Sequence, residues 1–170
     1  CHSCVAEKNK QGSLDYASAS PDELALVKGA SDMGFVFVNK TSKFIVIENR
    51  YLNKNDEKYT EEWELLAEIP FDSDRKRMSV VLKDSNGRYK IITKGADNVI
   101  IKRLRSYNIN KPSEKKEADI IKNIPNHLQF FGEKGLRTLL FAQRDLTELE
   151  YASFTDAYNV SYFNHLYYLC

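Results

Sequence analysis

The sequence lacks the long apolar run that a membrane-spanning helix needs. No stretch approaches the roughly 20 consecutive apolar residues that cross a bilayer, so these residues predict no membrane span. The chain also lacks a marked excess of one charge, because its formal net charge at pH 7 is +1. A near-neutral chain has no overall attraction to nucleic acid or to an anionic membrane. We therefore expect no nucleic-acid partner, and any basic function must be local.

Cysteine is scarce as well. The three cysteines, Cys1, Cys4 and Cys170, lie at the two ends of the 170 residues, and an odd number fits a reducing cytosol better than a secreted disulfide framework. Cys1 and Cys4 have the spacing of half a zinc site, but no second pair of cysteines or histidines follows at a usable distance. His127 and His165 are isolated. We therefore predict no metal site.

The familiar phosphate-binding loops are missing too. Neither a Walker loop nor Gly-x-Gly-x-x-Gly is present, and residues 132–135 resemble one only in composition. Asp72 and Asp74 follow an apolar stretch, as the paired aspartates of phosphoryl-transfer enzymes do. However, the basic residues 75–77 come next, and a Mg²⁺ site needs convergent carboxylates. We predict no catalytic residue in this chain.

Residues 69–97 are the most informative stretch. Two alternating runs, 78–83 and 89–93, are joined by a segment with Asn86-Gly87, which is a strong signal for a β-hairpin. The second run ends on Lys94 and Gly95, where a helical pattern begins, and a glycine there lets a ligand approach the backbone. Phe71 and Lys94 should thus lie near the ends of neighbouring strands. This arrangement predicts a ligand-binding surface.

The remaining elements follow from capping and periodicity. Ser20 as N-cap, Pro21 as first helical residue and Glu23 as capping-box partner predict a helix that Gly34 ends. A second capping-box pair, Thr147 and Glu150, predicts another helix. The other expected elements are loops at 7–15, 51–62 and 106–118, a hairpin of 35–38 with 44–48, a strand at 63–71, a short helix from Pro125 to Gly135, a buried strand at 136–142 and an aromatic tail, 158–170, that either finishes the last helix or packs on other parts of the protein.

Consecutive hairpins with helices between them indicate an α+β fold. We expect a single domain over 1–170, built on a twisted antiparallel sheet of about six strands flanked by helices. Regular βαβ alternation is missing, which argues against a doubly wound fold. The chain begins without an initiator methionine, so we expect a piece of a larger protein.

Each candidate binding residue has a structural alternative. A lone Phe71 would ordinarily be a core aromatic, although it could instead stack on a base. Lys94 at a strand end would ordinarily be solvated, although it could serve as a point charge for phosphate or adenine. Arg137 opens an apolar run, where burial would require a partner or ligand. Glu23 already has a role in the capping box, and residues 75–77 would by default form a solvated turn.

Four motifs occur in a fixed order: Ser-Pro-Asp-Glu at 20–23, Phe-x-Ser-x-Arg-Lys-Arg-Met-Ser-Val at 71–80, Lys-Gly-Ala-Asp at 94–97 and Gly-Leu-Arg-Thr-Leu at 135–139. Together they resemble the nucleotide-binding (N) domain of P-type ATPases. The first two motifs, with Asp97 in the third, are most similar to the type-IV subfamily, the phospholipid flippases. The Cys1-His2 step also resembles the opening of this domain in flippases. The resemblance covers residues 1 to about 145.

The resemblance implies roles for individual residues. Phe71 would stack on adenine, and Glu23 would contact the base or ribose side. Lys94 would line the adenine pocket near the phosphates, and Arg137 would reach the ribose and phosphate end. Glu23 can both cap and bind only if its carboxylate keeps an acceptor for the nucleotide. Further lining positions would be Ser73, Met78 and Gly95.

The resemblance also implies a function and partners. The domain would bind ATP and present its γ-phosphate to the phosphorylation domain of a phospholipid-translocating ATPase. The phosphorylation and actuator domains and the membrane helices of the same parent chain would be its partners, with an accessory subunit of the parent as a further candidate. It would be a cytosolic domain of an integral membrane protein, with Mg²⁺ used by the full enzyme but not held here. The phosphorylation motif Asp-Lys-Thr-Gly-Thr is missing, so the isolated chain should bind ATP without turnover.

Two alternatives remain open at this point. One is the N domain of an ion-pumping P-type ATPase, which the wording of the first and third motifs disfavours. The other is a protein-interaction module whose Phe71 and basic 75–77 surface docks an acidic or phosphorylated partner.

Overall fold

A computed structural model describes residues 1–9, 14–54, 57–108 and 110–163, with side chains described up to Asn159. The chain divides into two compact units. Unit 1 comprises Cys1–Ile69, Val80–Ile92 and Arg144–Cys170, and unit 2 comprises Pro70–Ser79 and Thr93–Gln143. Each unit is treated separately below. The predicted aromatic tail beyond Phe163, with His165 and Cys170, lies outside the described residues.

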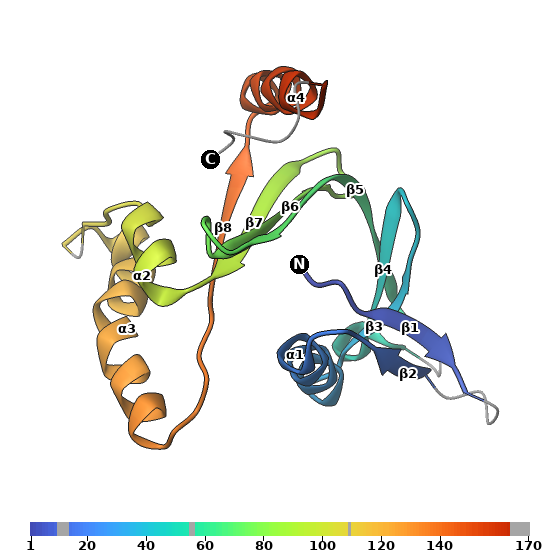
Figure 1. Cartoon of the computed structure of the whole chain (residues 1–170), viewed down its shortest axis with the longest axis horizontal. Coiled ribbons are helices and arrows are strands. Elements are labelled where there is room, and N and C mark those ends of the chain that lie inside the picture. Colours follow the sequence, from blue (N-terminus) through green and yellow to red (C-terminus); the bar gives the residue numbers. More distant parts are fainter. Residues whose placement is uncertain (10–13, 55–56, 109, 164–170) are drawn as a thin grey trace. The chain divides into compact units, whose positions relative to one another are not determined.

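The main sheet has six strands in the order β3-β4-β5-β6-β7-β8. The strands are β3 (Phe35–Lys40), β4 (Phe44–Asn49), β5 (Thr60–Asp72), β6 (Arg77–Lys83), β7 (Tyr89–Gly95) and β8 (Leu140–Leu146), and Figure 1 labels them. β4 pairs antiparallel with both β3 and β5. The predicted antiparallel sheet of about six strands, with helices in an α+β fold, is confirmed.

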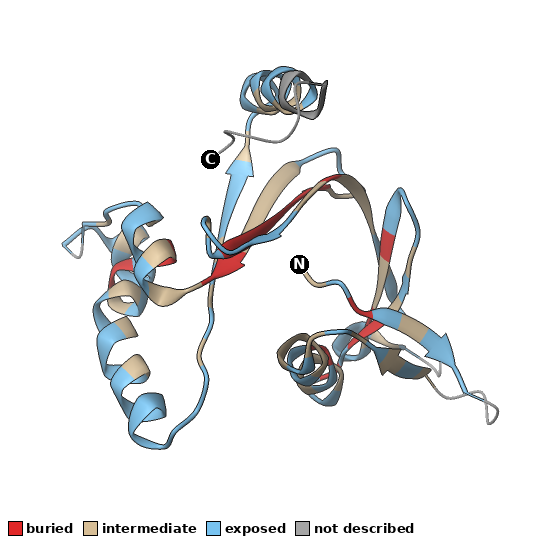
Figure 2. Cartoon of the chain, viewed as in Figure 1, coloured by how far each residue is buried: buried red, intermediate tan, exposed pale blue. Residues whose placement is uncertain are grey.

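β6 is the most deeply buried strand. All six residues from Arg77 to Leu82 are buried, and Figure 2 colours this strand as buried. The side chain of Val81 is fully covered. β6 lies between β5 and β7, so both of its edges are hydrogen-bonded. Ser79 Oγ lies 2.8 Å from Thr93 Oγ1 on β7, which lets a buried hydroxyl keep a hydrogen-bond partner. The core of the main sheet is therefore built around this strand.

The hairpin predicted from Asn86-Gly87 joins β6 to β7. Asp84 organises its turn, because Oδ1 accepts the backbone N–H groups of Asn86 and Arg88, both at 2.9 Å. The pKa of the Asp84 carboxyl is held below its ordinary value. The largest cause is the hydrogen bond from the Arg88 N–H, and the Arg88 guanidinium and the Asn86 N–H act in the same direction. Gly87 has φ +80°, the left-handed conformation that a glycine adopts without strain. The hairpin prediction is confirmed.

The first helix is also confirmed. α1 (Pro21–Asp32) begins after Ser20, whose Oγ accepts the N–H of Glu23 at 3.4 Å, and Gly34 follows its end with φ +90°. The capping box, however, is only half formed. The backbone N–H of Ser20 donates to Ser18 Oγ at 3.1 Å, so the Glu23 carboxylate does not cap it. Instead, Glu23 Oε2 accepts hydrogen bonds from Ser3.

The second capping box is complete. The Thr147 N–H donates to Glu150 Oε2 at 2.8 Å, and the Glu150 N–H donates to Thr147 Oγ1 at 3.2 Å. α4 (Glu148–Phe163) follows. Hydrogen bonds from Thr147, backbone first and side chain second, with Arg144 nearby, hold the pKa of the Glu150 carboxyl below its ordinary value. Both orphan donors at the start of α4 are thus satisfied as the sequence predicts.

The predicted loop over 7–15 is wrong at both ends, where residues 7–8 and 14–15 belong to strands, and its residues 10–13 lie outside the described residues. β1 (Val5–Lys8) and β2 (Leu14–Ala17) form an antiparallel two-stranded sheet. β1 and α1 both contact β3, and α1 lies beside this small sheet in Figure 1. Tyr16 stabilises the arrangement by donating its hydroxyl to the Phe37 carbonyl at 3.0 Å. These polar strands form because they pack against a neighbouring sheet, a tertiary contact that composition does not reveal.

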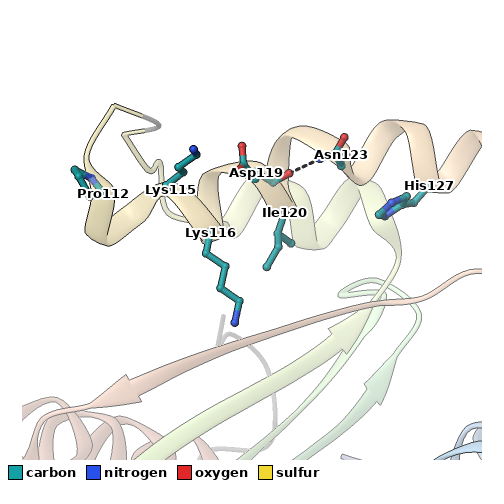
Figure 3. Close-up of a pocket in the computed structure, with 7 residues that line it drawn as sticks. All are labelled: Pro112, Lys115, Lys116, Asp119, Ile120, Asn123 and His127. Atoms are coloured by element: carbon teal, nitrogen blue, oxygen red, sulfur yellow. Dashed lines mark hydrogen bonds between the residues drawn. The ribbon is translucent and has the colours of Figure 1, made fainter.

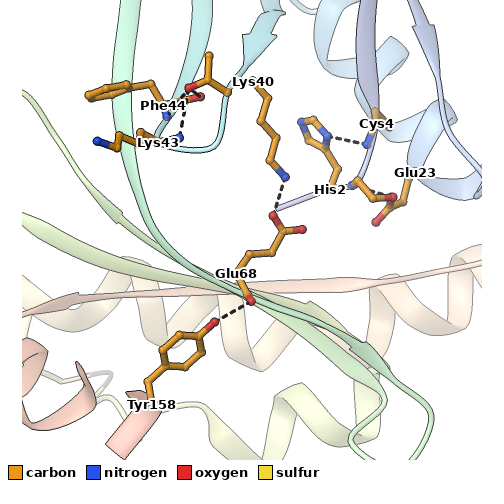
Figure 4. A network of polar contacts seen from close by, with 10 residues as sticks. His2, Cys4, Glu23, Lys40, Lys43, Phe44, Glu68 and Tyr158 are labelled. Atoms are coloured by element: carbon orange, nitrogen blue, oxygen red, sulfur yellow. Dashed lines mark hydrogen bonds and ion pairs between the residues drawn. The ribbon is translucent and has the colours of Figure 1, made fainter. Parts of the chain in front are cut away.

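A polar network links other parts of unit 1. The ammonium group of Lys40 on β3 lies 2.6 Å from Glu68 Oε2 on β5, and the Tyr158 hydroxyl of α4 donates to the Glu68 carbonyl at 3.4 Å (Figure 4).

The sequence predicts a loop over 51–62, between β4 and β5. A 3₁₀ turn, Arg50–Leu52, lies at its start. Among the described residues, none belongs to a helix long and apolar enough to cross a membrane.

In unit 2, the expected loop over 106–118 is wrong from Pro112 onward, and so is the expectation of a helix starting at Pro125. α3 (Lys115–Glu133) begins ten residues before that proline, after the short turns α2 (Asp97–Ile100), Ile101–Arg103 and Pro112–Glu114. Ala118, Ile121, Ile124 and Leu128 are buried or half-buried at helical spacing. A proline inside a helix removes a hydrogen bond and disfavours it by about 3 kcal/mol. The apolar stripe outweighs this penalty.

The end of α3 agrees with the prediction, but the strand after it does not. Gly135 has φ +68°, and the Leu136 N–H donates to the Phe131 carbonyl at 3.0 Å in a Schellman motif. β8 then begins at Leu140 rather than at 136, and Leu136, Leu139 and Phe141 are exposed. β8 is an edge strand of the sheet, so its apolar run does not imply burial on both faces.

Candidate functional site

Phe71 lies at the end of β5, directly before a tight turn. Asp72 closes that turn: its Oδ1 accepts the N–H groups of Asp74 at 2.7 Å and Arg75 at 3.1 Å, and its carbonyl accepts the Lys76 N–H at 2.6 Å. The N–H of Arg75, then that of Asp74, hold the pKa of the Asp72 carboxyl below its ordinary value. This aspartate therefore builds the turn.

The side chain of Phe71 is 65% exposed, so the interpretation of Phe71 as a core aromatic is wrong. Single apolar side chains are often exposed on protein surfaces, so exposure alone assigns no function to this ring. The rigid turn after it fixes where its backbone lies. An exposed ring on an ordered strand end can stack on a flat ligand.

Lys94 was expected to be solvated if it had no binding role, but it is buried. It is 6% exposed, near the end of β7, and is therefore not a solvated lysine. Lysine is almost never fully buried without compensation. β6 lies between β5, where Phe71 is found, and β7, which carries Lys94, so the prediction that the two residues end neighbouring strands is wrong.

Gly95 is required by a close backbone approach. A Cβ placed on Gly95 would lie 2.5 Å from the Lys76 carbonyl oxygen and 2.7 Å from the Arg77 Cβ. The same Lys76 carbonyl accepts the Ala96 N–H at 3.1 Å. The glycine was expected to admit a ligand, but its space is taken up by the turn after Phe71. This contact holds the Lys-Gly-Ala segment against the Arg-Lys-Arg segment.

The basic residues 75–77 do not form the simple solvated turn expected of them. Arg77 is 4% exposed and donates to the Arg75 carbonyl at 2.9 Å, and Lys76 has φ +52°. Arg75 is half-buried, and its Nη1 donates to the Pro70 carbonyl at 3.3 Å. Its Nε and Nη2 atoms are withdrawn from solvent without a hydrogen-bond partner. Sequence reasoning missed these orphaned donors, because only the folded turn buries them.

The other predicted residues of unit 2 differ in exposure. Ser73 is exposed in the turn, whereas Met78 is 3% exposed within β6. Arg137 is exposed on the segment between α3 and β8, so it does not lie in the buried strand that the sequence predicts over 136–142. Within unit 2, the structure brings the 71–78 and 94–96 segments together. Arg137 belongs to the same unit.

Glu23 belongs to unit 1. Both the backbone N–H of Ser3, at 2.8 Å, and the Ser3 hydroxyl donate to its Oε2 atom. Figure 4 shows this contact beside His2, whose Nδ1 accepts the Cys4 N–H at 3.2 Å. The Glu23 carboxylate is thus oriented by the start of the chain rather than by the capping box.

A surface depression lies elsewhere in unit 2. Its lining comes from the turn before α3 and from α3 itself, where Asn123 Nδ2 donates to the Asp119 carbonyl at 2.8 Å (Figure 3). None of the seven predicted site residues lines it. In the part of the chain that the structure describes, no three His, Cys, Asp or Glu side chains gather closely enough to hold a metal ion.

The fold and these motifs agree with a comparison to known families. The profile of the family described as "P-type ATPase, cytoplasmic domain N" matches residues 1–168. The chain therefore belongs to this family of P-type ATPase N domains.

Among curated proteins, the chain is similar to phospholipid-transporting ATPases. It is 40% identical over 161 residues to phospholipid-transporting ATPase dnf2 of Schizosaccharomyces pombe, covering 95% of this chain and 10% of that protein. It is 36% identical to DRS2 and 37% identical to DNF1, both phospholipid-transporting ATPases of Saccharomyces cerevisiae, covering 94% and 95% of this chain and 11% and 10% of those proteins. The chain thus spans about a tenth of the length of these relatives.

Proposed function

We propose that this chain is the ATP-binding domain of a phospholipid-transporting P-type ATPase, and that it presents the γ-phosphate of ATP to the phosphorylation domain of the same parent. Membership in the N-domain family and likeness to phospholipid-transporting ATPases support this proposal. The observation that carries it is that unit 2 holds a 65% exposed Phe71 and a 6% exposed Lys94, on segments that the backbone contact of Lys76 with Gly95 and Ala96 brings together.

The proposed contacts follow from the chemistry of each side chain. Phe71 stacks on the adenine ring, with stacking worth about 1–3 kcal/mol. The Lys94 ammonium attracts the phosphate end of the nucleotide as a compact charge. The Arg137 guanidinium hydrogen-bonds ribose or phosphate oxygens. Ser73, Met78 and Gly95 complete the proposed lining, with Gly95 acting through the backbone contact it permits.

Glu23 is a separate proposal. The family resemblance assigns it a contact on the base or ribose side. Within unit 1, one observation supports a binding role for Glu23: two hydrogen bonds from Ser3 to Oε2 fix the orientation of its carboxylate. Its conservative variant Glu23→Gln tests it independently of the residues of unit 2.

The mechanism in this chain is positioning rather than bond breaking. Phosphoryl transfer relies on holding the nucleotide in line with its acceptor and on stabilising charge. We propose that the acceptor aspartate, the actuator domain and the membrane helices belong to other parts of the parent, and that Mg²⁺ is held there together with the nucleotide phosphates. The isolated chain then binds ATP without turnover, with a dissociation constant on the order of millimolar, or about −4 kcal/mol.

An NMR titration of this chain with ATP, with and without Mg²⁺, tests the proposal, and GTP serves as the control nucleotide. We expect saturable shifts at Phe71, Lys94, Gly95 and Arg137, with ATP preferred over GTP and Mg²⁺ having little effect. An absence of shifts at several millimolar ATP would contradict the proposal. Such a result would favour a protein-interaction module instead. ATP would not displace an acidic peptide bound to such a module.

A further inference from the structure

We infer that Arg75 is a further binding residue of the proposed nucleotide site, and that its Nε–Nη2 edge takes the polyphosphate of the nucleotide. This inference rests on the proposed function. It starts from two nitrogen atoms, Nε and Nη2 of Arg75, which are buried without an acceptor. They form the edge with which a guanidinium grips a phosphate or carboxylate bidentately.

The two donors are already removed from water. A solvated arginine must give up hydrogen bonds to water before it can bind an anion, and this exchange leaves only a modest net gain. Arg75 has lost those bonds on folding, and no group among the described residues replaces them at Nε and Nη2. An unmet buried donor is costly. An anion can reach this edge in its buried position or draw it out. In either case the anion accepts hydrogen bonds from Nε and Nη2, and the free-energy cost of these two unmet donors is removed.

The rest of the guanidinium is anchored. Nη1 donates to the Pro70 carbonyl at 3.3 Å, and the N–H of Arg75 is held by Asp72 Oδ1 at 3.1 Å. Both partners flank Phe71, the proposed base-stacking residue. Arg75 is therefore tied by hydrogen bonds to the residues on either side of that ring, which suits a group that must meet the phosphates of the same ligand.

The surrounding charge favours an anion. The Lys76 carbonyl bonds to Ala96 and crowds Gly95, so the cationic residues 75–77 adjoin the segment that begins with the buried Lys94. The acidic residues of these two segments are Asp72, Asp74 and Asp97. Asp72 is engaged with backbone N–H groups of the turn, so its charge is already partly compensated. Four cations thus outnumber three carboxylates, and a polyphosphate fits this balance.

The test compares ligands that differ only in phosphate number. Adenosine, AMP, ADP and ATP are titrated into the wild-type chain, Arg75→Gln and Arg75→Lys, and binding is followed by NMR shifts. Inorganic tripolyphosphate is a fifth probe. Arg88→Gln is the matched control, because the Arg88 guanidinium pairs with Asp84 at the β6–β7 turn. The free energy of unfolding of each variant is measured alongside.

We expect Arg75→Gln to weaken ATP binding about tenfold, as loss of a charge-assisted hydrogen bond does, and to leave adenosine binding within twofold of wild type. The loss should grow with phosphate number, and tripolyphosphate should lose affinity as well. Arg75→Lys, which keeps the charge but not the bidentate edge, should recover part of the affinity. Arg88→Gln should bind all ligands as the wild type does.

The outcomes are distinguishable. Equal weakening of adenosine and ATP would overturn the inference, because Arg75 would then act only by shaping the turn around Phe71. Unchanged ATP affinity in Arg75→Gln would overturn it as well, while leaving the proposed function standing. If Arg75→Gln does not fold, the same criteria apply to Arg75→Lys. A wild-type chain that binds none of the adenine nucleotides would overturn the proposed function and this inference together.

Discussion

The carbonyl oxygen of Lys76 stands 2.5 Å from the position that a Cβ on Gly95 would occupy. The two residues belong to different motifs of the sequence, and their contact joins the turn after Phe71 to the end of β7. The Ala96 N–H, which donates to the same oxygen at 3.1 Å, fixes the approach. A glycine in this place is therefore a packing requirement, whatever ligand lies nearby.

Gly95→Ala should lower the free energy of unfolding by about 1–3 kcal/mol, as overpacking does. The clash is with backbone, which cannot rotate away as a side chain can. Gly132→Ala is the matched control, because a Cβ there meets nothing within 4 Å and alanine favours a helix. Denaturant unfolding of both variants checks the prediction. Equal stability of Gly95→Ala and wild type would show that the turn relaxes.

Phe71→Ala should weaken ATP binding by about 1–3 kcal/mol, the range of a base-stacking contact. The fold should be unaffected, with the free energy of unfolding within about 0.5 kcal/mol of wild type, because an exposed side chain contributes little to the core. The control is Phe141→Ala, which removes a 52% exposed ring from β8. Binding by NMR titration and unfolding by denaturant separate the two effects. Unfolding of Phe71→Ala would make the ring structural after all.

Lys94→Ala should also weaken ATP binding, but it should cost stability because the side chain is 6% exposed. Removing the buried stem leaves a cavity, and cavity formation lowers stability in proportion to its volume. Lys94→Met keeps most of the stem and removes the charge, so it isolates the electrostatic part. We expect Lys94→Met to be more stable than Lys94→Ala while binding ATP equally weakly. Wild-type ATP affinity in Lys94→Met would count against a phosphate-end role.

Local signals predicted local structure well. Ser20 and Pro21 predicted the start of α1, Gly34 and Gly135 predicted helix ends, and Asn86-Gly87 predicted the hairpin, because each acts through bonds within a few residues. The Glu23 capping box failed for a tertiary reason. Ser3, twenty residues away, offers two donors to the same carboxylate. A sequence window around the helix start does not contain that competitor.

Burial was harder to predict than element type. Phe71 is exposed and Lys94 buried, the reverse of what their hydropathy suggests, because strand order and the packed turn decide which surfaces are covered. The exposure of Phe141 on β8 has the same origin, since an apolar run on an edge strand looks identical to one in the centre. The motifs nonetheless selected the right family, because their order in the chain is itself information.

Acid should destabilise the start of α4 through Glu150. The pKa of this carboxyl is lowered in the folded chain, first by the Thr147 N–H and then by its hydroxyl, whereas in the unfolded chain it stays near 4.5. Its stabilising effect is thus fully present above about pH 5 and is lost as pH falls through the lowered folded value. Glu150→Gln should flatten the stability profile in that window.

Pro125 should be a position where replacement stabilises the protein. It lies inside α3, ten residues after the first residue of that helix, where proline cannot donate to the Ile121 carbonyl. Pro125→Ala should raise the free energy of unfolding by about 1–3 kcal/mol, the proline penalty less the entropy that proline removes from the unfolded chain. Pro21→Ala is the matched control, because Pro21 occupies the first helical position of α1, where no hydrogen bond is lost. That variant should be neutral or slightly less stable. Destabilisation by Pro125→Ala, measured by denaturant unfolding, would mean that the proline ring itself is needed for packing.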